Sequence, residues 1–440
     1  MITWRSGTVE QVGRSWPGAQ ELTVVVADGV SGPDPVTVRA LAYPALVGDL
    51  RPGDTVLLNV SALARGLGTG GYALVVAPGS PDRLPADPPA GPGHLVKARY
   101  TPLQAMVLGV DDQESPHHEV LRDADDLAGL PVVVADLHSA LPAVVAGVRY
   151  ADALLSQPGS GVPPLRVAYV MTDGGALPAW FSMAVAGLRD AGWIEACLTA
   201  GQAFGGDHEA VTLHTALLAA RHVVGADVVV VAQGPGNLGT GTRWGFSGVA
   251  AGEAVNAAAV LGGRPVASLR VSGADARERH LGVSHHSLTA YGRVALAPAD
   301  VVVPVFDPAA APVADEPVAG APGALRTGGE PGALRTGARP ADGGAGPGDQ
   351  PGLHVPDPQT HLDAHLAAVG RRVAQQARSL GEPAGRHRLV DVPAGADLLT
   401  ALGGSPVRLS TMGRGLAQDP AAFLAAAAAG VHAARLARGA

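Results

Sequence analysis

A glycine-rich loop after an apolar run is the segment of this chain best suited to bind an anion. The run ADVVVVAQ ends at residue 233, and GPGNLGTGTR follows at 234–243. Glycines allow neighbouring backbone amides to point at one anion, and polar side chains add further donors. The alternative is that the glycines only form tight turns. The predicted anion-binding residues are Gly234, Gly236, Asn237, Gly239, Thr240, Gly241, Thr242 and Arg243.

Two familiar nucleotide-binding loops do not fit this segment. A dinucleotide-binding G-x-G-x-x-G loop opens directly into a helix and is followed about 20 residues later by an acidic residue. Here the glycines continue to Gly248, and the first acidic residue after the next predicted strand is Asp275. No Gly-Lys-Ser/Thr sequence follows, which excludes a P-loop. The predicted ligand is therefore a small anion, and the sequence identifies no cofactor.

Two other predicted strand ends carry aspartates suited to acid–base chemistry. Asp136 and Asp173 each follow an apolar run and precede an Ala-Leu-Pro-Ala segment that starts a predicted helix. Ligands of open α/β sheets bind beyond the carboxyl ends of the strands, where both aspartates would lie. Capping of the following helix is the competing explanation. His138 is a candidate base or ligand beside Asp136, or simply a polar loop residue.

The segment 201–214 brings together two histidines and two acidic residues, which raises the question of a metal site. In metalloprotease helices the two histidines are four residues apart and share one face. His208 and His214 are six residues apart and diverge. An acidic helix start at Asp207 explains the segment better than a metal site does. We assign no metal ligands from the sequence.

The segment 272–293 is rich in histidine and arginine, which suits acid–base chemistry or anion binding, or else a solvated surface loop. His285 and His286 are adjacent, so we expect at most one of them to face a site. Arg414, between two glycines, is expected to cap the same surface. The catalytic candidates are Asp136, His138, Asp173, His280 and His285. The other candidates are Asp207, His208, Asp275, Arg277, Arg279, His286 and Arg414.

The hydrophobicity pattern of the chain predicts that these residues are positioned by an α/β fold. Continuous apolar runs alternate with Ala/Leu-rich helical stretches, as in a mostly parallel sheet with crossover helices. The predicted strands are 131–136, 165–172, 193–200, 226–233, 265–272 and 294–304, followed by RLVDV and VRLS near the C-terminus. The predicted helices are 141–155, 178–191, 208–224, 247–261, 359–381, one from Ala396, and one from Asp419 to Leu436.

Changes in composition divide the chain. Residues 1–79 alternate short β-rich runs with turn residues, which predicts a small antiparallel barrel or sandwich. Pro and Gly at 80–93 indicate a linker to the α/β domain at 94–306. Residues 307–358 contain the tandem repeat PGALRTGGE-PGALRTGAR, and we expect a disordered insertion there. Residues 359–440 are expected to complete the α/β domain.

The composition excludes several classes of protein. A formal charge of −8 provides no basic face for nucleic acid. No signal segment and no apolar run of about 20 residues is present, so we expect a cytoplasmic protein without a membrane partner. Cys197, the only cysteine, cannot form an internal disulfide, and it reads as a small buried hydrophobe. Lys97 is the only lysine, which we attribute to a GC-rich coding bias.

Several long motifs resemble a bacterial protein family of unknown function. They are GDLRPGDTVLLN, KARYTPLQ, GQAFGGDHEAV, QGPGNLGTGTRWGFSG, RHLGVSHHSLTAYGR and STMGRGLAQDPAAFLAAAAAG. The resemblance covers nearly the whole chain apart from 307–358. It implies no activity.

The function favoured by these residues is an enzyme that binds a small anionic or phosphorylated substrate at the strand-end loops. The alternative is a non-catalytic ligand-binding or regulatory protein that uses the same glycine loop. Convergence of Asp and His side chains near that loop would favour the enzyme. The sequence is also compatible with a homo-oligomer.

Overall fold

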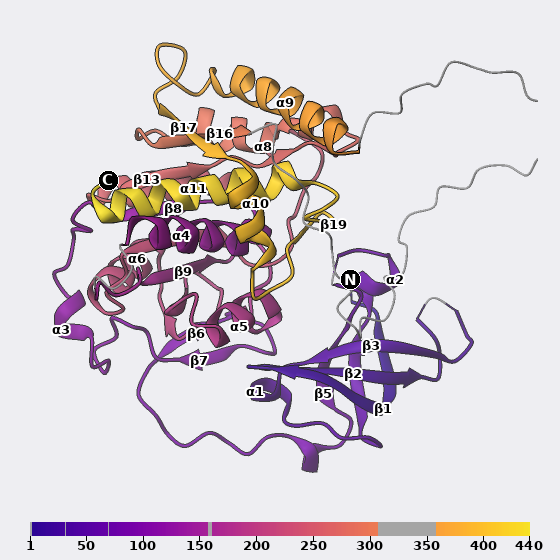
Figure 1. The fold of residues 1–440 in the computed structure, drawn as a ribbon. Helices are drawn as coiled ribbons and strands as arrows, with labels where there is room; N and C mark the ends of the chain where they lie inside the picture. The colour runs from indigo at the N-terminus through magenta and orange to yellow at the C-terminus, as the bar shows by residue number, and fades with distance from the viewer. Residues whose placement is uncertain (1, 31, 69, 157–160, 307–357) are drawn as a thin grey trace, which may run out of the picture.

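The computed structural model describes residues 2–30, 32–68, 70–156, 161–306 and 358–440 (Figure 1). Apart from Pro358, the predicted insertion at 307–358 lies outside the described residues. The N-terminal strands form a closed barrel, and eight of the later strands form one parallel sheet with helices on both faces. The predicted fold class is therefore confirmed.

The barrel has five strands in the order β1-β2-β3-β5-β4. All its strand pairs are antiparallel except β3 with β5. Alternate residues point inward, so Leu22, Val24 and Val26 are fully buried. The elements are β1 (Trp4–Trp16), β2 (Ala19–Val26), β3 (Val36–Ala42), α1 (Pro44–Val47), β4 (Thr55–Asn59), α2 (Ser61–Ala64) and β5 (Ala73–Pro78).

The parallel sheet has eight strands in the order β11-β10-β9-β12-β8-β13-β16-β17. Its central strands are valine- and alanine-rich and buried on both faces, as crossover helices require. The strands are β8 (Pro131–Val134), β9 (Val167–Thr172), β10 (Ala196–Thr199), β11 (His208–Glu209), β12 (Val228–Gln233), β13 (Arg264–Ser268), β16 (Asp300–Phe306) and β17 (Arg388–Ala394).

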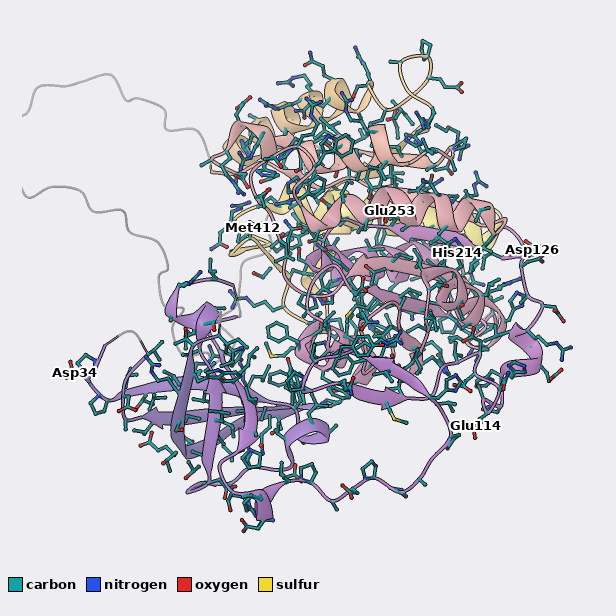
Figure 2. All side chains as sticks on the ribbon, turned by 180° about the vertical axis from the view of Figure 1, so that it is seen from behind. Asp34, Glu114, Asp126, His214, Glu253 and Met412 are labelled. Carbon is teal, nitrogen blue, oxygen red and sulfur yellow. The ribbon has the colours of Figure 1, made fainter. Side chains whose placement is uncertain are left out.

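Helices α4 and α11 cover one face of this sheet, while α6 and α7 cover the other (Figures 1 and 2). The main helices are α4 (Leu141–Leu155), α5 (Met183–Asp190), α6 (Leu213–His222), α7 (Ala250–Val260), α8 (His285–Thr289), α9 (Pro358–Ala377), α10 (Ala396–Gly403) and α11 (Pro420–Arg438). Short pieces complete the chain: β6 (Leu95–Lys97), β7 (Ala105–Val107), α3 (His118–Leu121), β14 (Val271–Ser272), β15 (Gly282–Val283), β18 (Ser410–Thr411) and β19 (Arg414–Gly415). The short strands pair as β6-β7, β14-β15 and β18-β19.

Helices α4 and α11 approach each other closely enough to require glycine in both. A Cβ atom on Gly147 would overlap the backbone carbonyl of Ala427, and one on Gly430 would overlap that of Val144. Within the described residues α11 is also the one helix that by length and composition could cross a bilayer, and 78% of that stretch is buried in the core. A core helix of a globular domain has the same properties.

Trp180 joins the barrel to the α/β domain. Its backbone carbonyl accepts a hydrogen bond from the Trp16 indole at 2.7 Å. Its ring contacts Tyr43 of the barrel and Phe204 of the α/β domain, with centroid separations of 6.0 and 5.5 Å. Aromatic contacts of this kind bury area that a flexible linker alone would leave exposed.

Several predicted elements differ from the observed ones. The stretch predicted as helix from 208 begins with strand β11, and α6 starts only at Leu213, where the Thr212 hydroxyl caps it. The strand predicted at 294–304 starts at Asp300. The last predicted strand, VRLS, does not join the sheet, because Ser410–Thr411 pairs with Arg414–Gly415 in a separate hairpin.

Candidate functional site

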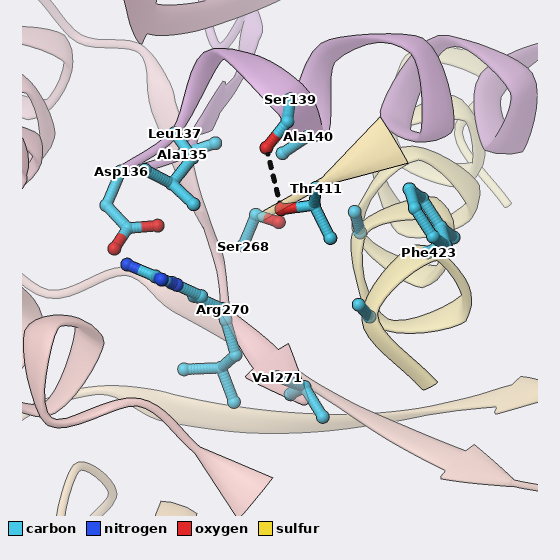
Figure 3. Close-up of a pocket in the computed structure, with 13 residues that line it drawn as sticks. Ala135, Asp136, Leu137, Ser139, Ala140, Ser268, Arg270, Val271, Thr411 and Phe423 are labelled. Atoms are coloured by element: carbon cyan, nitrogen blue, oxygen red, sulfur yellow. Dashed lines mark hydrogen bonds between the residues drawn. The ribbon is translucent and has the colours of Figure 1, made fainter. Parts of the chain in front are cut away.

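Asp136 lies directly beyond the carboxyl end of β8, and its carboxyl group faces the Arg270 guanidinium in a small pocket (Figure 3). The residue is 3% exposed, and its Oδ2 atom has no hydrogen-bond partner among the described residues. A buried carboxylate oxygen without a partner is costly, so such an atom needs an explanation. The polar and aromatic residues that line the pocket are Asp136, Ser139, Ser268, Arg270, Thr411 and Phe423.

The electrostatics of the pocket suit a proton-transfer group. Burial raises the pKa of the Asp136 carboxyl, and the positive charge of Arg270 opposes that rise. A raised carboxyl pKa is a property of many carboxyl groups that act as general acids or bases in enzymes. On the far wall, the hydroxyls of Ser139 and Thr411 are hydrogen-bonded at 3.0 Å (Figure 3).

Gln233 connects Asp136 to the glycine-rich loop. Its side-chain amide donates to the Asp136 backbone carbonyl at 3.0 Å and to Asn237 Oδ1 at 3.1 Å. The Gln233 Oε1 atom is buried, and no described residue forms a hydrogen bond with it. Gln233, Asp136 and Gly248 line a second small pocket. The beginning and end of the glycine-rich loop therefore border Asp136.

Arg270 connects Asp136 to the histidines of the 272–293 segment. Its Nη1 atom lies 3.0 Å from His286 Nδ1, and a guanidinium can only donate, so the imidazole nitrogen accepts. The His286 ring stacks on Phe246, with centroids 3.9 Å apart and planes 2° from parallel. Phe246 lies near the end of the glycine-rich stretch, so direct contacts connect this stretch to His286 and, through it, to Arg270.

His280, His285 and His286 form a cluster. One ring nitrogen from each lies within 4.8 Å of the others. The expectation that at most one of His285 and His286 faces a site is wrong, because both occupy the first turn of α8, where imidazole side chains are long enough to converge. The His280 Nδ1 atom forms a hydrogen bond at 2.8 Å with the hydroxyl of Ser284, the residue that directly precedes His285.

The outer part of the glycine-rich loop is exposed and largely bonded to itself. Residues 236–244 are exposed, and the Thr240 amide donates to the Gly245 carbonyl at 2.7 Å. The hydroxyls of Thr240 and Thr242 are 3.3 Å apart and bond within the loop. The tight-turn alternative thus explains these two threonines, while the buried ends of the loop contribute to the pockets.

A family model described as "Protein of unknown function (DUF3866)" matches residues 39–430. The chain belongs to this family. No curated protein matches its sequence. Asp136, Arg270 and the histidine cluster all lie inside the matched range.

Three other candidates of this DUF3866 chain, Asp275, Arg277 and Arg414, belong to an ionic network beside the site. Asp275 accepts hydrogen bonds from Arg277, and Arg414 lies 3.4 Å from Asp275 and 3.3 Å from Asp419. These arginines hold the pKa of Asp275 well below its usual range, so this carboxylate stays charged. Arg279 contacts the His280 ring at 3.4 Å. The network fixes the loops that carry the cluster.

The remaining acidic candidates lie away from Asp136. Asp173 is exposed and accepts a hydrogen bond from the Gln202 amide at 2.8 Å. Asp207 bonds the Cys197 amide and Arg189, and His208 packs edge-on against His117. The structure does not bring these three side chains together with Asp136.

His138 is next to the pocket but has no free ring nitrogen. Its two nitrogens bond the Tyr169 hydroxyl at 2.9 Å and the Ser182 hydroxyl at 2.7 Å, and burial lowers its pKa to about 4. Ser182 also caps α5 by accepting from the Val185 amide. His138 therefore ties α4, β9 and α5 together.

Acidification from pH 6.5 to 4.5 is expected to destabilise this DUF3866 protein. His387 resembles His138: its Nδ1 accepts the Ala299 amide, its Nε2 faces the Tyr291 carbonyl, and burial lowers its pKa. In the unfolded state both histidines begin to bind protons near pH 6.5. In the folded state their lowered pKa values keep them neutral at that pH. Stability is then lost as pH falls, by about 1.4 kcal/mol per pH unit and group. The raised pKa values of Asp136 and Glu209, both caused by burial, act in the opposite direction.

Urea unfolding at pH 7.5, 6.5, 5.5 and 4.5, with a chelator present, measures this dependence. His387→Gln should reduce the dependence of the free energy of unfolding on pH. His222→Gln, which changes an exposed histidine, should leave that dependence unchanged. A free energy of unfolding that is constant or rises on acidification would contradict the prediction.

Sequence reasoning missed Arg270 and Gln233. Arg270 follows β13 inside PVASLRVS, which reads as one strand, and Gln233 is the last residue of β12. One signal could have identified Arg270, namely a charged residue at the end of an apolar run, since parallel strands end at the ligand-binding edge of a sheet.

Proposed function

We propose that this protein is an enzyme that acts on a small anionic substrate at the pocket between Asp136 and Arg270. The observation that carries the proposal is the buried Asp136 carboxyl, whose Oδ2 atom has no partner and which faces a guanidinium at the carboxyl end of the parallel sheet. Such a pair offers a cation for the substrate and a proton-transfer group beside it.

Each residue then has a distinct task. Arg270 binds a carboxylate or phosphate oxygen of the substrate, because its planar guanidinium can donate two parallel hydrogen bonds. Asp136 takes up or delivers the proton, since its raised pKa suits that role. The hydroxyls of Ser139 and Thr411 donate to the remaining polar atoms of the substrate.

A thermal-shift screen with phosphate, small phosphate esters and small carboxylates tests the proposal. A bound anion at 100 times its dissociation constant should stabilise the protein by about 2.7 kcal/mol. Arg270→Gln should abolish this stabilisation. Asp136→Asn should preserve or strengthen anion binding, because it removes a negative charge from the pocket, but should abolish turnover of any substrate found.

Arg243→Gln is the matched control, since Arg243 is an exposed arginine of the glycine-rich loop. If Arg243→Gln abolishes the stabilisation and Arg270→Gln does not, the exposed loop binds the anion and the proposed pocket is wrong. If Asp136→Asn retains full turnover, the protein does not use Asp136 in catalysis. If a ligand binds without being converted, the protein is a non-catalytic binding protein.

A further inference from the structure

The three clustered histidines have the composition of a transition-metal site. Within the described part of the chain, His280, His285 and His286 are the one group of three or more potential ligands close enough to share an ion. Imidazole nitrogens are common ligands of Zn²⁺, and three histidines with an open fourth position form a typical catalytic zinc site. His280 and His286 are buried, and His285 is half-buried.

The cluster is held by neighbours that are not themselves ligands. The Ser284 hydroxyl contacts His280 Nδ1 at 2.8 Å and orients that ring. The other nitrogen, Nε2, accepts a hydrogen bond from Arg279 at 3.4 Å, so this guanidinium must also give way before His280 can bind an ion. Phe246 stacks on His286 and fixes the plane of its ring. Metal-binding histidines usually have one nitrogen held in this way by a second group.

We propose that His280, His285 and His286 bind one divalent transition-metal ion, with Zn²⁺ as the best match, and that Arg270 moves from His286 to Asp136 when the ion binds. His286 Nδ1 is occupied by Arg270 at 3.0 Å, so the guanidinium competes with a metal for this ring. Asp136, which faces the same guanidinium, has a free buried carboxylate oxygen to receive it.

The positive charge of the surrounding arginines favours an anionic fourth ligand on the metal ion. Arg270, Arg277 and Arg279 place positive charge around the cluster and disfavour a bare cation. This repulsion decreases when the ion carries an anionic fourth ligand, either hydroxide or a small anion. The metal site stands on the geometry of the histidines and does not depend on the proposed enzymatic function.

Isothermal titration of the full chain with ZnCl₂ after chelator treatment tests the proposal, with Co²⁺ absorption as a report on imidazole coordination. We expect one Zn²⁺ per chain. His280→Ala and His286→Ala should each weaken binding at least tenfold, while His222→Ala, an exposed histidine outside the cluster, should have no effect. Circular dichroism of each variant shows whether it folds, and the Co²⁺ spectrum of the wild-type protein tests the site without any variant.

Arg270→Gln provides a result that a merely structural role would not produce. It removes both a competing donor and a positive charge, so Zn²⁺ should bind more tightly, whereas Asp136→Asn should weaken binding by removing the acceptor for the displaced guanidinium. Absence of one-to-one Zn²⁺ binding, or binding that both histidine variants leave intact, overturns the metal site. Unchanged or weaker binding in Arg270→Gln overturns the exchange of partners. Neither outcome bears on anion binding without metal, which the thermal-shift screen measures separately.

Discussion

Replacing Lys97 with methionine is expected to lower the free energy of unfolding by about 3–5 kcal/mol. The Lys97 side chain is completely buried, and its ammonium group donates to the carbonyls of Gly201, Ala203 and Ala210 at 2.7–2.9 Å. The Glu209 carboxylate lies 3.5 Å away. Methionine fills a similar volume but leaves three buried acceptors and one buried carboxylate without their cation, and urea unfolding measures the loss.

The double variant Lys97→Met/Glu209→Gln separates the charge from the packing. It removes the stranded carboxylate, so it should recover part of the stability that the single variant loses. Arg122→Met is the matched surface control, because Arg122 and Glu119 form an exposed ion pair at 2.6 Å and such pairs contribute about 0–1 kcal/mol. A loss in Lys97→Met as small as that of the control would show that the buried pair is not important for the fold.

The second large effect is expected from Gly430→Ala, which should destabilise the protein by about 3 kcal/mol. Inside a helix this change normally stabilises by about 1 kcal/mol, because alanine restricts the unfolded chain. Here the new methyl group would overlap the Val144 carbonyl of α4, and two helix backbones must separate to make room. The measurement is again urea unfolding, and the predicted sign is opposite to that of helix propensity.

Gly370→Ala is the control for this variant. Gly370 lies inside α9, and the nearest atom to a new methyl group is a side-chain carbon of Phe306 at 3.3 Å. The Phe306 ring can shift where a backbone carbonyl cannot, so we expect little change or a small gain in stability. If both glycine variants behave alike, the α4–α11 approach is not the cause.

The sequence predicted the layers of the fold well because the relevant signal is local. Runs such as VVVVAQ are buried on both faces, and their alternation with Ala-rich helices distinguishes a parallel sheet from other arrangements. The same reasoning overextended β13, where PVASLRVS reads as one strand although the chain turns at Arg270 between β13 and β14. Hydrophobicity alone does not mark such a turn.

The site was harder to predict because it depends on contacts between distant segments. Asp136 was identified from its position at a strand end, but its facing group, Arg270, lies 134 residues later in the sequence (270 − 136). Lys97 was attributed to coding bias, although its three backbone acceptors lie more than 100 residues away. All three histidines were candidates, but their convergence was not predicted, because the rule that neighbouring side chains diverge fails for long side chains in the first turn of a helix.

The two outer strands of the parallel sheet limit how copies of this protein can join. β11 has only two residues, which is too short a ladder for another chain to extend. β17 is longer, but Pro393 lacks an amide hydrogen, and the exposed Asp391 would put a charge against any added strand. The barrel is closed and has no edge. Strand addition, the usual route to fibrillar aggregation, is therefore disfavoured at the closed barrel and at both edges of the eight-stranded sheet.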